Sequence, residues 1–128
     1  MTDPAAILAS VAASSQEVAH DELPHIGPRS GADSGDPQVA ARVLASDAAS
    51  GTDVGVWSCT PGGWPVESRT DTEVAHILGG RAIITDDGGA RRELGAGDAI
   101  IFPVGWTGRW DVVEDLRKLY VLIRPTTG

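Results

Sequence analysis

The sequence predicts an all-β fold, either an antiparallel sandwich or a small barrel. From Val54 onward, short runs rich in β-branched and aromatic residues are separated by Gly, Pro and Asp. Each run has the length of a strand and is too short for a helix. Asp86–Gly89 and Gly95–Asp98 are strong signals for tight turns. Short strands at regular spacing with such turns are typical of sandwiches and small barrels.

Residues 50–124 are predicted to form this one barrel, followed by a tail at 125–128. A chain of 128 residues with 41% hydrophobic content suits one domain with one modest core. The predicted strands, in order, are Val54–Thr60, Thr72–Leu78, Arg81–Thr85, Ala99–Phe102, Gly108–Val113 and Lys118–Arg124.

Residues 1–49 differ in composition and are predicted to be an N-terminal extension that is mostly irregular or short-helical. All six aromatic residues lie after residue 56, and the first fifty residues carry seven acids and two arginines among many Ala and Ser. The stretch Leu23–Pro37 is punctuated by Pro and Gly, which predicts a loop or partial disorder. Asp3 and Pro4 are suited to cap a short helix whose apolar face holds Ile7, Leu8, Val11 and Val18.

The charge of the chain excludes two classes of partner. Eighteen acidic against ten basic residues give a formal net charge of -8, which repels nucleic-acid phosphates and anionic lipid. No run of apolar residues is long enough to span a bilayer. The apolar stretch Ala5–Ala13 has no Lys or Arg ahead of it, so it lacks the positive region of a secretory signal. We therefore expect a cytoplasmic protein.

Cys59 is the only cysteine. An intrachain disulfide is excluded, and so is a zinc site that takes two thiolates from one chain. Cys59 is predicted to be a small buried residue of the core.

Several sequence blocks occur in an order that points to one family. They are GVWSCTPG at 55–62, EVAHILGG at 73–80, GDAIIFPVG at 97–105, Trp110, and RKLY at 117–120. Over residues 50–124 the chain resembles a small cupin of the ethanolamine-utilisation and ureidoglycine-aminohydrolase-like subfamily. The resemblance implies a double-stranded β-helix, the cupin jelly-roll barrel, whose open mouth holds a ligand or a metal. Family membership does not by itself give a reaction.

The resemblance also implies a metal site, of which this chain keeps one ligand. The usual set is two histidines spaced by one residue, a glutamate, and a third histidine. Glu73 matches the glutamate. The first two histidine positions fall on Glu67 and Arg69, or one residue earlier on Val66 and Ser68, and the third falls on Gly108. We therefore expect no cofactor, with weak binding of a divalent metal as the alternative.

His76 is the one histidine of the barrel. It would act with Glu73 as a metal ligand only if both side chains pointed inward. Three residues along a strand place them on opposite faces, which favours a position on the outer face or at a subunit contact.

The alternation of side chains along the strands predicts a polar pocket. If Glu73 points inward, an unbroken strand also turns Glu67, Arg69 and Asp71 inward. Trp110 faces the same interior from a later strand. Such a group would hold a small ligand with charged and flat parts. The alternative is an internal ion pair of Arg69 with Glu67 or Glu73.

Lys118 and Tyr120 share one face of the last strand and are predicted to flank the pocket. The resemblance to ureidoglycine aminohydrolase implies that Lys118 holds the carboxylate of a substrate. The alternative is a lysine that reaches the rim with its alkyl chain packed. Trp57, Trp64 and Trp106 are predicted to pack in the core or at the rim.

Two functions follow from these residues, and the sequence leaves both open. In the first, the protein is an enzyme in which Glu73 or Glu67 acts as a general acid or base, Arg69 and Lys118 bind anionic groups, and Tyr120 orients a small carboxylate or nitrogen-containing metabolite. In the second, it is a metal-free binding, sensing or accessory module. A structural subunit is a third possibility. In each case we expect a homodimer.

Overall fold

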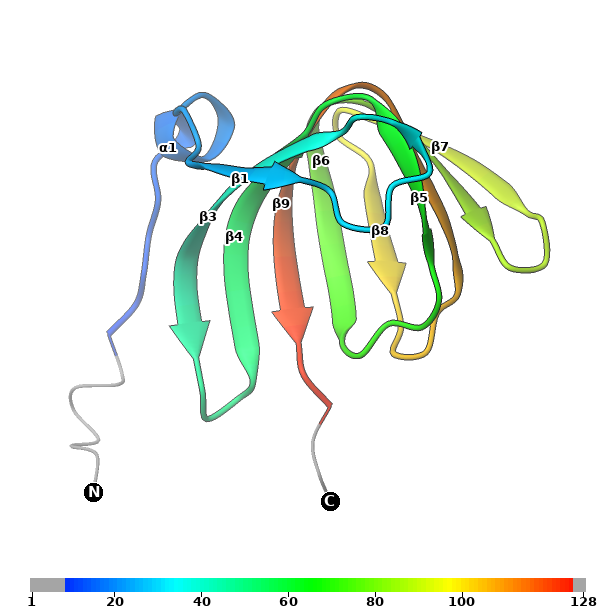
Figure 1. The fold of residues 1–128 in the computed structure, drawn as a ribbon. Helices are drawn as coiled ribbons and strands as arrows, with labels where there is room; N and C mark the ends of the chain where they lie inside the picture. Colours follow the sequence, from blue (N-terminus) through cyan, green and yellow to red (C-terminus); the bar gives the residue numbers. More distant parts are fainter. Residues whose placement is uncertain (1–8, 126–128) are drawn as a thin grey trace.

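The computed structural model describes residues 9–125. The described part holds one short helix and nine strands (Figure 1). In chain order they are α1 (Ser15–Ala19), β1 (His25–Pro28), β2 (Ser34–Gly35), β3 (Gln38–Asp47), β4 (Thr52–Cys59), β5 (Gly62–Val66), β6 (Thr72–Asp86), β7 (Arg91–Gly95), β8 (Ala99–Phe102) and β9 (Gly108–Ile123). Within this range, no helix has the length and apolar character needed to cross a membrane.

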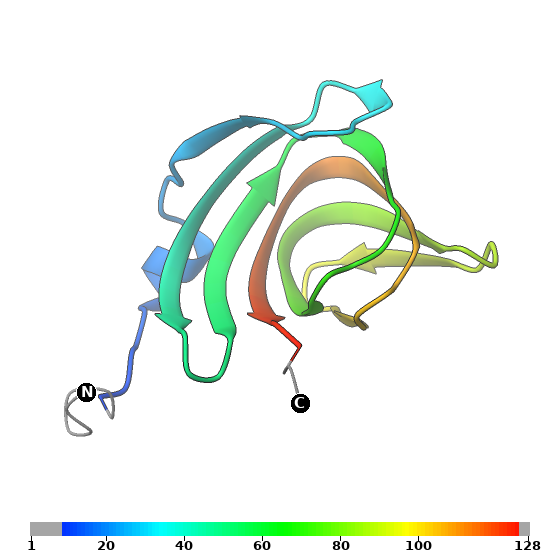
Figure 2. The ribbon, with the colours of Figure 1, turned by 60° about the horizontal axis from the view of Figure 1, so that its bottom comes forward.

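All strand pairs are antiparallel, and the sheet curls around an interior. One path of neighbours runs β1-β3-β4-β9-β5-β2, and β6 pairs with β7, β8 and β9. The long strands β6 and β9 arch together through the molecule, as Figure 2 shows. The predicted all-β barrel is confirmed.

Each of these two long strands merges two predicted strands. Thr72–Leu78 and Arg81–Thr85 both lie in β6, while Gly108–Val113 and Lys118–Arg124 correspond to β9. The sequence predicts a break at Gly79–Gly80, but the chain continues through an irregular pairing there. Gly80 has a φ of +83°, and a Cβ on it would lie 2.0 Å from the carbonyl oxygen of Asp115. Only glycine fits this bend.

The largest departure from the sequence-based prediction is in the N-terminal extension. The prediction of an irregular segment is wrong for residues 38–47. These residues form β3, which pairs with β4 along the length of β4. Residues 25–28 and 34–35 form two more strands inside the predicted loop. The strand pattern of β3 is weak in the sequence because alanines stand among its valines, as at Ala40, Ala41 and Ala45. Pairing with β4 supplies the stability that propensity does not show.

The helix of the described residues, α1, begins after Ser14. Ser14, rather than Asp3, caps α1, and its hydroxyl accepts a hydrogen bond of 3.1 Å from the backbone N–H of Glu17. Val11 is not helical. Asp3, Pro4, Ile7 and Leu8 lie outside the described residues. The Arg117 guanidinium donates hydrogen bonds to backbone carbonyls in this region, at 2.9 Å to Val18 and 2.8 Å to Asp21.

Two strands carry no clear strand signal in the sequence. The first, β5, has two glycines and a proline in five residues. The second, β7, is mostly charged and exposed. Both predicted turns are present. Gly89 N–H donates to the Asp86 carbonyl at 2.8 Å, and Asp98 N–H donates to the Gly95 carbonyl at 3.0 Å.

The core fills the space between the two halves of the curled sheet. Its largest fully buried side chains include Phe102, Ile77, Ile84 and Leu116. Cys59 is buried among them, which confirms that prediction. Its burial raises the pKa of the thiol to about 11.

Candidate functional site

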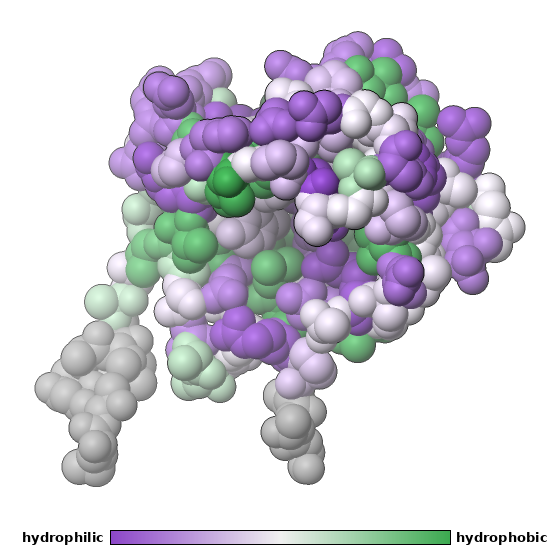
Figure 3. All heavy atoms as spheres, viewed as in Figure 1, coloured by the Kyte–Doolittle hydropathy of each residue, from purple (hydrophilic) through white to green (hydrophobic). Residues whose placement is uncertain are grey.

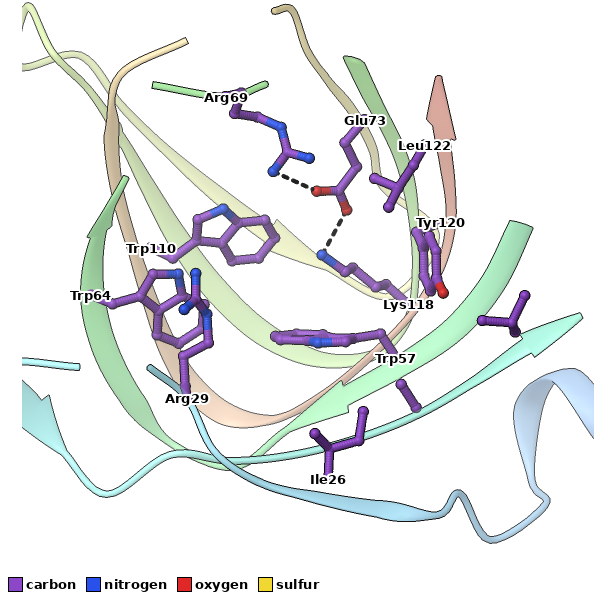
Figure 4. Close-up of a pocket in the computed structure, with 12 residues that line it drawn as sticks. Ile26, Arg29, Trp57, Trp64, Arg69, Glu73, Trp110, Lys118, Tyr120 and Leu122 are labelled. Atoms are coloured by element: carbon purple, nitrogen blue, oxygen red, sulfur yellow. Dashed lines mark ion pairs between the residues drawn. The ribbon is translucent and has the colours of Figure 1, made fainter. Parts of the chain in front are cut away.

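A cavity of about 400 Å³ lies inside the curled sheet. In the space-filling view this face of the molecule is hollowed, and hydrophobic and hydrophilic residues lie together at the hollow (Figure 3). The side chains that line it are shown in Figure 4. They are Ile26, Arg29, Ala41, Val43, Trp57, Trp64, Arg69, Glu73, Trp110, Lys118, Tyr120 and Leu122.

Strand β9 supplies four of the side chains that line the cavity. Trp110, Lys118, Tyr120 and Leu122 all line it, as the period of two along a strand requires. Gly55 of β4 lies directly opposite Tyr120. A Cβ on Gly55 would come within 2.3 Å of the Tyr120 hydroxyl oxygen, so this glycine leaves the space that the phenol occupies.

Glu73 lies at the centre of a buried charge cluster. Its residue surface is 4% exposed, and that of Lys118 is 6% exposed. The Lys118 ammonium lies 2.6 Å from Oε2 of Glu73, and the Arg69 guanidinium lies 3.1 Å from Oε1 (Figure 4). Arg69 also contacts the Asp71 carboxylate at 2.6 Å. Two cations therefore surround this buried carboxylate.

One oxygen of that carboxylate, Oε2, is fully buried against the Lys118 ammonium. The two atoms lie 2.6 Å apart, which is the distance of a charge-assisted contact. The charge on this oxygen is therefore compensated within the protein by Lys118.

Three indole rings form the apolar walls of the site. The rings of Trp64 and Trp110 are nearly parallel, with centroids 6.1 Å apart. The ring of Trp57 meets that of Trp64 at 67° and 6.2 Å. The Lys118 ammonium lies 4.3 Å from the Trp57 centroid and 4.6 Å from the Trp110 centroid. These distances are those of cation–π contacts, which further stabilise the charged lysine.

Arg29 is a site residue that the sequence analysis missed. It follows β1, and its Cζ lies 5.0 Å from the centroid of the Trp64 ring. Within residues 9–125 it forms no ion pair, and its hydrogen bond goes to the carbonyl oxygen of the adjacent Ser30. Burial lowers the pKa of the Arg29 guanidinium from its ordinary value, yet arginine keeps its charge at neutral pH. Its place in a Pro/Gly-rich stretch of the sequence gave no signal of a pocket.

Most of the predicted pocket residues lie together, but Glu67 does not. Arg69, Glu73, Trp110, Lys118 and Tyr120 all line the cavity. Burial, followed by the negative charges of Asp53 and Glu73, raises the pKa of the Tyr120 phenol, which therefore stays a neutral hydrogen-bond donor.

Glu67 is exposed and lies outside the cavity lining. Residues 67–71 are not part of a strand, so the predicted alternation does not extend back to it. Asp71 contacts Arg69 from beside the cavity. His76 is exposed on the face opposite to Glu73. The internal ion pair of Arg69 with Glu73 is present within the pocket itself.

The donor set does not fit the divalent metal that the resemblance implies. Among the described residues, no group of three or more His, Cys, Asp and Glu side chains is placed to hold a metal ion. The Glu73 carboxylate faces Lys118 and Arg69, whose charges oppose a cation. At Gly108, the third histidine position, a Cβ would lie 2.4 Å from the Trp106 ring. The indole fills the space that an imidazole there would need.

A curled antiparallel sheet that holds a polar site in its interior is the architecture of the cupin barrels. The family model of the EutQ-like cupin domain matches residues 47–120, more than half of the chain. The chain belongs to this family. No curated protein matches the sequence.

Solved structures share the fold at low sequence identity. A Pseudomonas syringae protein of unknown function from the DUF861 family has a TM-score of 0.74 at 24% identity, covering 80% of this chain. The chain spans 45% of that protein. The EutQ protein of Clostridium difficile has a TM-score of 0.60 at 19% identity, covering 69% of each chain. A Thermotoga maritima protein described as a predicted oxalate decarboxylase has a TM-score of 0.62 at 21% identity, covering 81% of this chain and 95% of that one.

Proposed function

We propose that this cupin barrel binds a small anionic metabolite without a resident metal. The observation that carries the proposal is the charge of the cavity lining. Three cations, Arg29, Arg69 and Lys118, line the cavity together with one carboxylate, Glu73. The whole chain has a net charge of -8, so positive charge is concentrated where a ligand would enter.

The cations do not have equal freedom to bind a ligand. Lys118 and Arg69 already contact Glu73, so a carboxylate ligand would share them with that residue. Tyr120 lines the same space with a hydroxyl group. The indole rings exclude water from one side, which strengthens each charge-assisted hydrogen bond in the pocket.

Catalysis by Glu73 is the second candidate function. It is favoured by the position of Glu73, a buried carboxylate that lines the cavity. An ionised carboxylate in this position could accept a proton from a bound substrate, with Arg69 holding its other oxygen. Glu67 is not proposed for this role because it is exposed outside the cavity lining.

Native mass spectrometry of protein purified without chelator, followed by calorimetric titration with a panel of small carboxylic acids, tests the binding proposal. We expect a retained or titratable acid, with affinity reduced in Lys118→Met. The matched control is Arg92→Gln on β7, whose side chain is 63% exposed outside this cavity. If no small anion binds at millimolar concentration, the proposed function is wrong. A turnover of any bound acid that Glu73→Gln abolishes would establish the catalytic alternative.

A homodimer and a cytoplasmic location remain proposals. Among the described strands, β7 and β8 each pair only with β6, and the nearby Ile101 and Val104 side chains are 65% and 48% exposed. Covering such apolar residues favours self-association. Light scattering at micromolar concentration measures the mass directly, and a monomer would contradict the proposed dimer.

A further inference from the structure

We propose that the ligand of this cavity is an aliphatic monocarboxylate whose carboxylate is bound by Arg29 and whose alkyl chain lies on an apolar rim. The apolar rim consists of four side chains of the cavity lining, Ile26, Ala41, Val43 and Leu122. The inference rests on the proposed function of binding in the barrel, and it names the ligand class. Two observations carry it: an arginine of the lining without a carboxylate partner among the described residues, and apolar side chains of the lining that are open to solvent.

The inner part of the cavity offers little free surface to a ligand. Its side chains are each at most 6% exposed, and they are Trp64, Glu73, Trp110 and Lys118. The charges of Glu73 and Lys118 compensate each other at 2.6 Å. The two indole rings stack on each other, and the Lys118 ammonium lies over the Trp110 ring. A ligand therefore meets the outer part of the cavity, where the lining is more exposed.

Arg29 is the cation of this outer part, and the fold holds it in place. Its backbone N–H donates a hydrogen bond of 2.8 Å to the carbonyl oxygen of Pro37. Its guanidinium lies over the Trp64 ring, and Nη1 donates to the carbonyl oxygen of Ser30. No carboxylate within residues 9–125 pairs with this arginine. The edge formed by Nε and Nη2 therefore matches the two oxygens of a bound carboxylate.

The apolar rim supplies the free surface for an alkyl chain. Ile26 and Val43 both line the cavity, yet they are 67% and 59% exposed. Arg29 directly follows β1, the strand that carries Ile26, so the cation and the rim share one segment of the chain. Figure 4 shows Leu122 across the group from Arg29. An alkyl chain that extends from Arg29 over these side chains removes apolar surface from water, which favours binding.

The charges of the lining favour one carboxylate in the ligand over two. Arg69 and Lys118 are both paired with Glu73, so neither is free to bind a second carboxylate at the far end. That end also carries the apolar side chain of Leu122. The cavity of about 400 Å³ lies toward the small end of the range of ligand sites, which suits a chain of about eight carbons or fewer.

A homologous series separates the two features in calorimetric titrations at one pH and one ionic strength. The probes are butanoate, hexanoate and octanoate, together with the uncharged hexan-1-ol and the dicarboxylate hexanedioate. We expect the affinity of the three monocarboxylates to rise by about threefold for each added methylene group. Hexan-1-ol and hexanedioate should each bind about tenfold more weakly than hexanoate, because the first lacks the charge for Arg29 and the second places a charge on the apolar rim.

Two variants locate the carboxylate. Arg29→Gln should weaken all three monocarboxylates by about tenfold or more and leave hexan-1-ol unchanged. Arg29→Lys, which keeps the charge and loses the fork, should fall between Arg29→Gln and the unmodified protein. Arg92→Gln is the matched control and should change none of the affinities, because that side chain lies on β7 outside the cavity. Both Arg29 variants should unfold at nearly the original temperature, since they break no ion pair.

A third variant locates the alkyl chain. Val43→Thr keeps a β-branched side chain that suits a strand and replaces a methyl group of the rim with a hydroxyl group. It should weaken octanoate by about threefold and butanoate by less, because the longer chain covers more of the rim. Val113→Thr is the matched control. Val113 lies on β9 outside the cavity lining and is 41% exposed, so this change should alter neither affinity.

The outcomes separate this inference from the proposed function. Equal affinities of butanoate and octanoate would overturn the alkyl chain, and unchanged affinities in Arg29→Gln would overturn the anchor. A lower mass of Val43→Thr in light scattering would show that a second copy of the chain covers the rim, which also overturns the inference. In each case the proposed function stands if some small acid binds. If no acid of the wider panel binds, the proposed function and this inference fail together.

Discussion

At the scale of single residues, the stability of the fold depends on the cations that pair with the buried carboxylate of Glu73. Moving a charge out of water is costly unless it is paired, and Glu73 has a lysine at 2.6 Å and an arginine at 3.1 Å. Lys118 in turn lies against the faces of Trp57 and Trp110. These contacts explain why a strand that is otherwise buried at this point carries a lysine.

Lys118→Met should destabilise the fold by about 3 kcal/mol, because Glu73 would then keep only Arg69 as a partner for its buried charge. The double variant Lys118→Met with Glu73→Gln should recover a large part of this loss, since the uncompensated charge is removed. Urea unfolding of the four proteins of this cycle measures both quantities. If Lys118→Met is as stable as the unmodified protein, the ion pair of Lys118 with Glu73 contributes nothing to the stability of the fold.

Cys59 gives the fold a pH dependence at the alkaline end. Burial raises the pKa of its thiol from 9.0 to about 11, so the unfolded chain releases this proton first. The stabilising contribution is complete below pH 9.0 and is lost as the pH rises to about 11. The free energy of unfolding should therefore fall less steeply over this range in Cys59→Ala. If the free energy of unfolding falls equally steeply with pH in both proteins, the raised pKa of the Cys59 thiol is contradicted.

At the scale of elements, the pocket exists because two strands bend together. Strand β9 pairs through its first part with β5 and the end of β6, and through its second part with β4 and the start of β6. The change of partners brings Trp110 and Lys118 to one interior. The irregular pairing at Gly79–Arg81 is where β6 follows the bend of its neighbour.

Gly80→Ala should destabilise the fold by about 3 kcal/mol, because the new methyl group meets the Asp115 carbonyl and the backbone has a positive φ. Gly79→Ala is the matched control, since no atom lies within 4 Å of its Cβ position and its φ is not in the left-handed region. It should change stability by less than about 1 kcal/mol. Thermal and urea unfolding of both variants test whether the bend requires glycine at position 80. Equal losses of stability in Gly80→Ala and Gly79→Ala would contradict this requirement.

At the scale of the whole molecule, an acidic protein encloses a basic cavity. The net charge of -8 belongs to the chain as a whole, while the lining has three cations to one carboxylate. The same charges make the interior unsuited to a divalent cation. Lys118 lies beside Glu73, and the Trp106 indole blocks the side of Gly108.

Removal of metal should leave the protein unchanged. We expect elemental analysis to find less than about 0.1 manganese, iron, nickel or zinc per chain, and we expect EDTA to shift the midpoint of thermal unfolding by less than about 1 °C. The same protein kept free of chelator is the control. One metal per chain, together with a lower midpoint in EDTA, would contradict the charge argument.

Several features of the fold and the site follow from local sequence. The turns at Asp86–Gly89 and Gly95–Asp98 and the strand Ala99–Phe102 lie where the residues predict them. The shared face of Lys118 and Tyr120 follows from the period of a strand. Arg29 could not be found in this way, because the segment that carries it has no periodicity and reaches the cavity only through the pairing of β1 with β3.

The sequence by itself determined the fold class, the cupin family and five of the lining residues, because alternation, turns and ordered motifs are local properties that a chain records directly. The tertiary structure decided that β3 joins the sheet, that Glu67 lies outside the cavity, and that Glu73 pairs with both Lys118 and Arg69. These are contacts between segments distant in sequence, and their energies depend on the burial and partners that only the folded chain supplies.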